Sequence, residues 1–297
     1  MTSSPEHTRL LGLATRASLA VACTLIVAKA IAWWLSGSVS LLAGLTDSLL
    51  DGAASFLNLL AVHYALRPAD DDHRYGHGKA EALSGMAQAL FIAVSAFLIG
   101  FQAVERILHP EPVGAPGLGI AVMLLSIALT VALLILQHKV VKETDSAAIR
   151  ADSLHYRSDL LLNASILLAL GLAYFGYAHL DAWFGLAIAV YILWSAISIA
   201  RETVSVLMDA ELPVDVSTRM LALAKNVPGV LGAHDLRTRI SGTHWFVQLH
   251  LELPGSLTLS DAHALCDEVE HAINREFPRA EVLVHADPKE FIKQIAV

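Results

Sequence analysis

Acidic and imidazole side chains recur at helical spacing in two otherwise apolar stretches of the chain. Asp47 and Asp51 are four residues apart, so they share one face of a helix. His155 and Asp159 have the same spacing in a second apolar stretch. Three carboxylates and one imidazole can bind a divalent cation, and Zn²⁺ accepts such ligands in tetrahedral geometry. Fe²⁺, Cd²⁺, Co²⁺ and Mn²⁺ also fit, because one imidazole shifts the metal preference only modestly.

The apolar surroundings make these carboxylates costly. An aspartate at the centre of a membrane helix costs roughly 2.5–3.5 kcal/mol on insertion scales, and no Lys or Arg lies on either stripe. The alternative is that the groups lie near membrane ends and are hydrated, which suits Asp152 but not the two paired stripes. Since intramembrane ionisable residues are functional sites by default, the sequence predicts a metal site formed by these four residues.

A second group lies in the polar loop that follows the first acidic stretch. Asp70, His73 and His77 have spacing that allows a metal site, and Gly76 eases backbone closure. A hydrated acidic loop is an equally good interpretation of the spacing. The nearby string GHGKA lacks the earlier Gly and the following Ser or Thr of a phosphate loop, so no ATP site is expected.

Six of the 14 histidines lie in the last third of the chain. His285 and Asp287 are two residues apart and share a face of a predicted strand. His234 and His250 lie on the two preceding strands, and His263 lies in a helix that could cover the sheet. These five residues could form a third cluster, although a single histidine is more often an exposed surface residue. His244 and His271 are expected to be such surface residues.

The elements that carry these residues divide the chain into two parts. Charged residues make up 16% of the chain, against about 25% in soluble proteins. A bilayer is crossed by about 20 apolar helical residues. Six stretches qualify, at residues 11–35, 39–66, 80–108, 116–137, 147–177 and 182–207. The sequence therefore predicts a membrane domain of six transmembrane helices over residues 1–208.

Positive residues cluster at the N-terminus and in the loops after the second and fourth stretches. The positive-inside rule then places both termini in the cytoplasm. Residues 209–297 contain no further span, and their pattern predicts an αββαβ order in a small cytoplasmic α+β domain. The net charge of −8 argues against a nucleic-acid partner. The two cysteines, Cys23 and Cys266, form no CxxC metal motif.

Five strings resemble the cation diffusion facilitator family, and in particular its bacterial zinc and ferrous-iron efflux branch. They are residues 40–51 (SLLAGLTDSLLD), 68–81 (PADDDHRYGHGKAE), 151–159 (ADSLHYRSD), 232–239 (GAHDLRTR) and 285–288 (HADP). The resemblance covers nearly the whole chain. One departure is Ala286, where similar family members carry Gln, and another is Ala210, where they often carry Arg.

The resemblance implies a homodimeric, proton-coupled metal exporter of the inner membrane with a ferredoxin-like, metallochaperone-like tail. By analogy, the membrane cluster is the transport site, the loop cluster is an interfacial site, and the tail cluster is a binuclear site that bridges two tails. It further implies a charge pair between Lys79 and Asp209 at the membrane–tail junction, and an apolar gate at Leu154.

Three other functions remain as alternatives. A membrane-anchored metal sensor would use the tail cluster without transport. A metal-dependent membrane hydrolase would need an open metal position and a general base, and no HExxH occurs. A channel is disfavoured, because tight multidentate sites release ions too slowly for conduction. A secondary transporter, rather than an enzyme, is expected.

Overall fold

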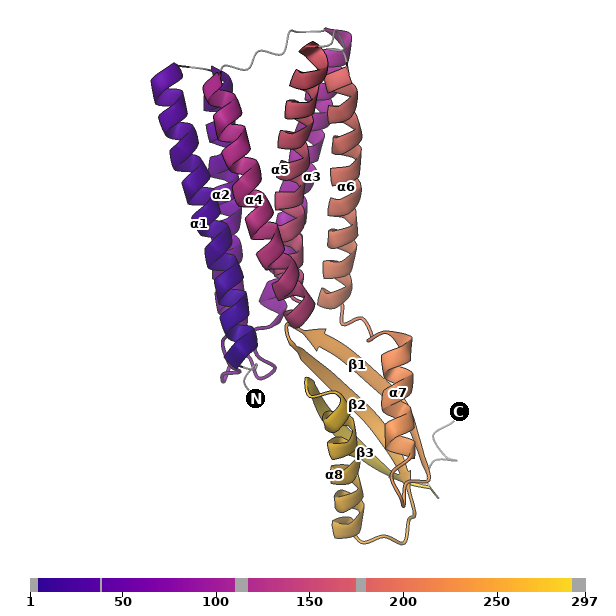
Figure 1. Cartoon of the computed structure of the whole chain (residues 1–297). Coiled ribbons are helices and arrows are strands. Elements are labelled where there is room, and N and C mark those ends of the chain that lie inside the picture. The colour runs from indigo at the N-terminus through magenta and orange to yellow at the C-terminus, as the bar shows by residue number, and fades with distance from the viewer. Residues whose placement is uncertain (1–4, 38, 110–116, 175–179, 290–297) are drawn as a thin grey trace. The chain divides into compact units, whose positions relative to one another are not determined.

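The computed structural model describes residues 5–37, 39–109, 117–174 and 180–289. The chain forms two compact units, Met1–Val204 and Ser205–Val297. The first unit consists of six long helices (Figure 1). Only the end of the last helix, from Ser205 to Leu207, belongs to the second unit. These helices are α1 (Pro5–Ser36), α2 (Val39–Ala65), α3 (Lys79–Leu108), α4 (Gly117–Thr144), α5 (Ala147–Tyr174) and α6 (Leu180–Leu207).

The six long helices correspond to the six predicted spans, and the predicted ends at residues 116 and 177 lie outside the described residues. Among the described residues, five of the helices are long and apolar enough to cross a membrane. The exception is α5, whose first half carries Asp152, His155, Arg157 and Asp159. Two of these residues, His155 and Asp159, belong to the predicted metal site.

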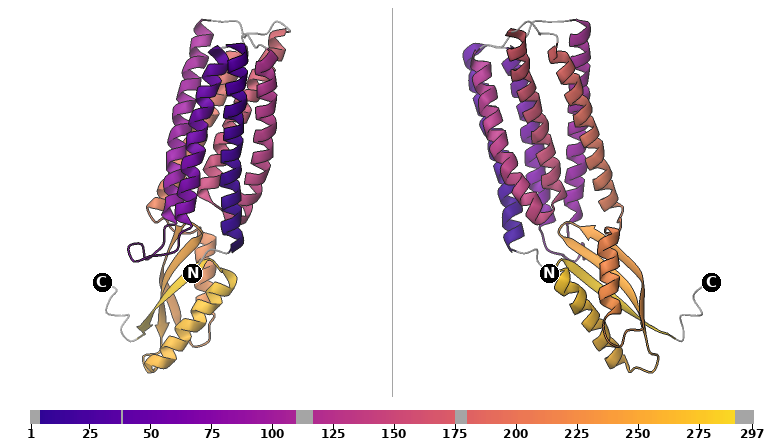
Figure 2. Two further views of the ribbon diagram at one scale, coloured as in Figure 1. Left: turned by 90° about the vertical axis from the view of Figure 1, so that its left-hand side faces the viewer. Right: turned by 45° about the vertical axis from the view of Figure 1, so that its right-hand side comes forward.

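The six long helices of this unit run side by side (Figure 2). Two groups of buried side chains hold them together, and α5 contributes to both. Leu11, Val62, Val140 and Ile149 join α1, α2, α4 and α5 in one group. The other group joins α3, α5 and α6 through mostly small residues, among them Ala89, Ala151 and Ala196. Because small side chains let helix backbones approach closely, they favour helix packing in membranes.

The second unit is a three-stranded sheet with two helices, as the αββαβ prediction expected. Its elements are α7 (Val214–Lys225), β1 (Gly232–Ser241), β2 (His244–Leu253), α8 (Leu259–Glu276) and β3 (Ala280–Pro288). The strand order is β1-β2-β3, with β1 antiparallel and β3 parallel to β2.

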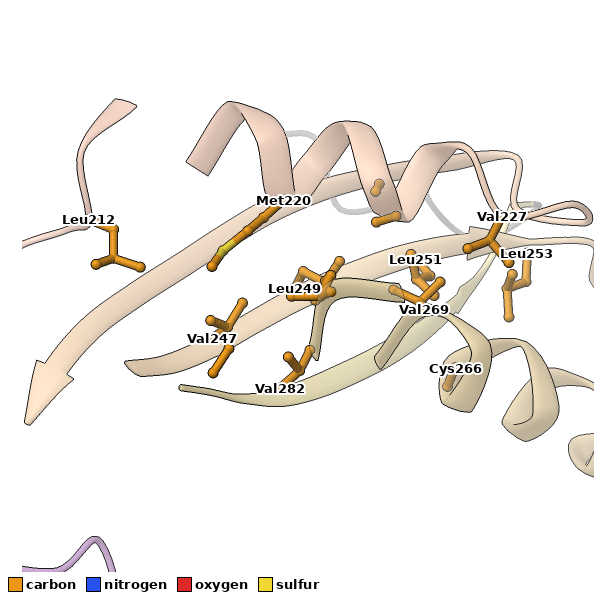
Figure 3. Packing of buried hydrophobic residues seen from close by; sticks show 14 residues of the cluster. Leu212, Met220, Val227, Val247, Leu249, Leu251, Leu253, Cys266, Val269 and Val282 are labelled. Carbon is orange, nitrogen blue, oxygen red and sulfur yellow. The ribbon is translucent and has the colours of Figure 1, made fainter. Parts of the chain in front are cut away.

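One face of the sheet forms the core of this unit with α7 and α8 (Figure 3). Leu249 and Leu251 of β2 pack against Met220 of α7 and Val269 of α8. Strand residues alternate between faces, so His250 points to the opposite face. The register places His234, His250 and His285 side by side across the three strands.

Candidate metal centre

Asp51 of α2 meets His155 and Asp159 of α5 inside the helical unit. The Nε2 atom of His155 lies 3.0 Å from Asp51 Oδ1 and 3.8 Å from Asp159 Oδ2. One donor atom from each of the three residues lies within 4.8 Å of the others. The side chain of His155 is only 11% exposed, and its Nε2 atom makes no hydrogen bond in the described structure. A buried imidazole nitrogen facing two carboxylate oxygens is suited to ligate a cation.

Asp47 lies one turn before Asp51 on α2 and interacts electrostatically with Asp51 and His155. Its side chain is the most exposed of the four predicted ligands, and it is not part of the close group of three. The structure thus brings three of the predicted residues together and places the fourth beside them. Its participation as a ligand remains a prediction.

Asp152 is not hydrated, contrary to the interpretation from its position near a span end. The residue is 1% exposed, and its Oδ2 atom accepts hydrogen bonds from Ser18 Oγ (2.6 Å) and Gln137 Nε2 (2.7 Å). Tyr156, on the same helix, donates to the Ser18 carbonyl oxygen and contacts Ser55 Oγ. These partners lie on α1, α2 and α4, so the local spacing within α5 could not indicate them.

Lys29 of α1 is a basic residue near the site. The spacing of acidic residues within α2 and α5 could not indicate it, because it lies on another helix. Its Nζ atom donates to Ser48 Oγ at 2.6 Å and to the Gly44 carbonyl oxygen at 3.1 Å. Ser48 is the neighbour of Asp47 on α2. A positive charge from a third helix therefore lies close to the acidic stripe.

The loop between α2 and α3 brings Asp70, His73 and His77 together. Asp70 Oδ1 lies 3.2 Å from His73 Nδ1, and Asp70 Oδ2 lies 3.3 Å from His77 Nε2. Gly76 adopts a φ of 76°, which is open to glycine at no steric cost and closes the loop. The backbone N–H of His73 donates to Asp70 Oδ1, and this bond holds the pKa of that carboxyl below its usual value.

The two loop histidines differ in their surroundings. The side chain of His77 is 3% exposed and packs edge-on against Tyr64, whereas that of His73 is half exposed. The Nδ1 atom of His77 is buried without a hydrogen-bond partner in the described part of the chain. His77 is thus the anchored member of the group and His73 the accessible one.

In the tail, His234, His250 and Asp287 form a third compact group. Asp287 Oδ2 lies 2.7 Å from His250 Nδ1 and 3.7 Å from His234 Nε2. His285 completes the row, with its Nε2 atom 3.1 Å from Asp287 Oδ1. The alignment follows from the strand register, so the prediction of a shared strand face for His285 and Asp287 agrees with the geometry.

His263 is not brought to this group within one chain. Its side chain is 75% exposed on α8, and Asp267 lies 3.8 Å from it. Since α8 covers the opposite face of the sheet, the two locations are separated by the core. Two further carboxylates do border the group, Glu252 at 3.4 Å from His234 and Asp235 at 3.7 Å from His250. Asp235 comes close because the β1 register shifts after His234.

The remaining predicted residues have these positions. Leu154 is partly buried against the α3–α5–α6 group. Lys79 begins α3, and Asp209 lies 3.7 Å from Arg239 in the second unit. The pair between Lys79 and Asp209 joins different units and stays a prediction. His271 is exposed, as expected, whereas His244 is only partly exposed and burial lowers its pKa, so the expectation of a surface residue is wrong for His244.

These acidic and histidine groups on a helical membrane unit and a small α+β unit define a class of metal transporter. A family model of the cation efflux transmembrane domain matches residues 15–208, and one of the cytoplasmic domain of cation efflux proteins matches residues 212–289. The chain belongs to this family, the cation diffusion facilitators. It is therefore an inner-membrane transporter for divalent metal cation efflux and not an enzyme.

Individual relatives align along nearly the full length. The cation-efflux pump FieF of Klebsiella pneumoniae is 46% identical over 287 residues, which are 97% of this chain and 96% of the relative. FieF of Yersinia enterocolitica is 47% identical over 284 residues, which are 96% and 95% of the two chains. The tail also matches a structure of CzrB in its zinc form, at 36% identity over 28% of this chain and 96% of that one, with a TM-score of 0.27.

Proposed function

We propose that this chain exports Zn²⁺, or alternatively Fe²⁺, Cd²⁺, Co²⁺ or Mn²⁺, in exchange for protons across the cytoplasmic membrane. The transport site consists of Asp47, Asp51, His155 and Asp159. The observation that carries the proposal is the approach of His155 Nε2 to Asp51 and Asp159 on two different helices. A site shared between α2 and α5 can be opened by a relative movement of helices, which alternating access requires.

The exchange with protons is supported by the donor set. To bind a metal, the imidazole of this site must be neutral and its carboxylates ionised, so protons and metal compete for the same atoms. When the site faces the cytoplasm, metal binding displaces protons from it. When it faces outward, the entry of protons displaces the metal.

Export also needs an energy source. Moving one charge across 100 mV corresponds to about 2.3 kcal/mol, so a divalent ion that leaves a negative-inside cell meets roughly twice that cost. The sequence has no complete phosphate-loop motif, and inward proton movement is a driver that the site chemistry can use. We therefore assign proton antiport rather than ATP hydrolysis.

The other groups have supporting roles in this proposal. Residues 1–208 form the transport domain, in which α5 spans the membrane like the other five long helices. Residues 209–297 form a cytoplasmic domain, and both termini of the chain lie in the cytoplasm. The loop group captures or relays metal, and the tail group links two copies of the chain. His263 then reaches the tail group of a second copy, since it does not reach its own.

Metal uptake into proteoliposomes under an imposed pH gradient tests the proposal. Each metal is offered separately, and flux is compared between the wild type and Asp51→Ala. Because Asp51 provides the oxygen nearest to His155, we expect the variant to lose at least about tenfold in flux, the effect of about 1.4 kcal/mol or more.

A membrane-anchored metal sensor is the second candidate, and the compact tail group favours it. The same experiment separates the two functions. Loss of flux in Asp51→Ala with unchanged metal binding at the tail supports a transporter. If the wild type binds metal only at the tail and carries none across the bilayer, the transport proposal is wrong.

A further inference from the structure

Lys29 lies within the apolar helix α1, in the candidate span Glu6–Ser36. A lysine near a span end commonly extends its side chain toward the membrane surface. Here the ammonium instead donates to Ser48 Oγ and to the Gly44 carbonyl oxygen of α2. Both acceptors belong to the helix that carries two of the transport-site carboxylates.

The acceptors and the carboxylates share one face of α2. Gly44, Asp47, Ser48 and Asp51 follow the spacing i, i+3, i+4 and i+7, which places them along a single stripe. Ser48 is 2% exposed, so the hydrogen bond from Lys29 is shielded from the surroundings. Lys29 also interacts electrostatically with Asp47 and, across the site, with Asp159 of α5.

Formal charges indicate what this ammonium does. The site holds three carboxylates and one imidazole, so a divalent ion leaves one negative charge uncompensated. Burying such a charge in an apolar medium is strongly unfavourable. The Lys29 ammonium offsets this charge, and its attraction to the three uncompensated carboxylates of the metal-free site is stronger still, so it favours the site without metal.

We propose that Lys29 is a built-in cation of the transport site that weakens metal binding and thereby speeds metal release. This proposal rests on the proposed transport site. Lys29 acts on the metal through the field it adds to Asp47 and Asp159, and it is a positioning residue rather than a ligand. Its hydrogen bonds to Ser48 and Gly44 hold the ammonium on the stripe.

The test uses the full-length protein with Asp70→Ala and Asp287→Ala, so that the membrane site dominates metal binding. Zn²⁺ affinity is measured by calorimetry, and KM and kcat are measured by flux into proteoliposomes. Lys29→Met removes the charge and the hydrogen bonds. Lys29→Gln removes the charge but can still donate to Ser48, and Lys29→Arg keeps both. Lys142→Met is the matched control, since it removes the same charge from an exposed position of α4.

Loss of the cation removes its repulsion of Zn²⁺, so we expect Lys29→Met and Lys29→Gln to bind Zn²⁺ about tenfold more tightly or more. KM and kcat should both fall in these variants, while Lys29→Arg and Lys142→Met remain near the wild type. Unchanged or weaker Zn²⁺ binding in Lys29→Gln overturns the proposal. If Lys29→Met does not fold, the Gln and Arg variants decide the question.

Asp51→Ala in the same background separates this inference from the proposed function. If Asp51→Ala still binds Zn²⁺ as the unmodified background does, the transport site itself is wrong and the role of Lys29 falls with it. If Asp51→Ala loses binding while Lys29→Gln matches the background in affinity, KM and kcat, only the role of Lys29 is wrong.

Discussion

Three buried histidine nitrogens lack a hydrogen-bond partner in the described structure, and each belongs to a different acidic group. They are Nε2 of His155, Nδ1 of His77 and Nδ1 of His234. A buried polar atom without a partner costs about 1–3 kcal/mol, so its occurrence calls for a physical reason. For two of these atoms, a bound cation is a suitable reason. Nε2 of His155 lies 3.0 Å from a carboxylate oxygen of Asp51, and Nδ1 of His234 lies 3.4 Å from one of Glu252.

Arg219 and Glu276 provide a test of pH dependence at the residue scale. Arg219 donates from Nε and Nη2 to the two carboxylate oxygens of Glu276, at 2.7 Å and 2.9 Å, and these bonds lower the pKa of Glu276. A carboxyl with a lowered folded-state pKa stabilises the fold above its unfolded pKa. That stabilisation is lost as the pH falls through the folded value.

We therefore expect Arg219→Met to reduce the protection of α7 and α8 against hydrogen exchange near pH 7. The difference from the wild type should be small, since the pair is on the surface, and should fade only below about pH 4.3, the usual glutamate value. Exchange corrected for the intrinsic rate at each pH measures it. Arg275→Met, which removes an exposed arginine from α8, is the control. A difference that grows on acidification would contradict this assignment.

At the scale of elements, α5 is the helix on which the membrane unit depends. It shares one buried group with α1, α2 and α4 and another with α3 and α6. Its polar contacts add to this packing, because Asp152 is bonded to Ser18 of α1 and Gln137 of α4. The position of His155, one turn further along α5, is therefore fixed by neighbours on both sides.

Gln137→Leu tests this network. The substitution removes the amide that donates to Asp152 Oδ2 and to Ser18 Oγ, and it leaves a buried carboxylate with one bond fewer. We expect a destabilisation of about 1–3 kcal/mol, seen as a lower unfolding temperature of the detergent-solubilised protein. Gln102→Leu, at an exposed position of α3, makes the same chemical change and should have little effect. Equal unfolding temperatures for the two variants would show that these hydrogen bonds do not stabilise the membrane unit.

At the scale of the whole molecule, the tail residues suggest how two copies are linked. The histidine row lies on the sheet face opposite the core, and His263 lies on the exposed side of α8. A metal shared between copies would join these two locations. The match to the dimerisation domain of cation efflux proteins is consistent with such a pair.

Metal removal tests this link in the full-length protein. A spin label at Ser256, in a variant with Cys23 and Cys266 replaced by serine, reports the distance between two tails. We expect Zn²⁺ to narrow the distance distribution and a chelator to broaden it, because bound metal restrains both tails. His263→Ala should abolish the narrowing, whereas His271→Ala, on the same helix, should leave it intact. Narrowing that persists in His263→Ala would rule out this role for His263.

The sequence by itself determined which residues share a face. Helical periodicity pairs Asp47 with Asp51 and His155 with Asp159, and strand alternation pairs His285 with Asp287. These relations are local, so they hold wherever the elements form. Apolar length likewise marked six long helices, and the αββαβ order of the tail was confirmed.

Only the tertiary structure decided which faces meet. It brought Asp51 to His155, placed Lys29 beside Ser48, and kept His263 away from the tail histidines of its own chain. It also showed that Asp152, expected to be hydrated, is buried, and that its partner Ser18 is 134 residues away in the chain. Such contacts arise from packing between distant elements, and local periodicity contains no information about which neighbour a helix face will find.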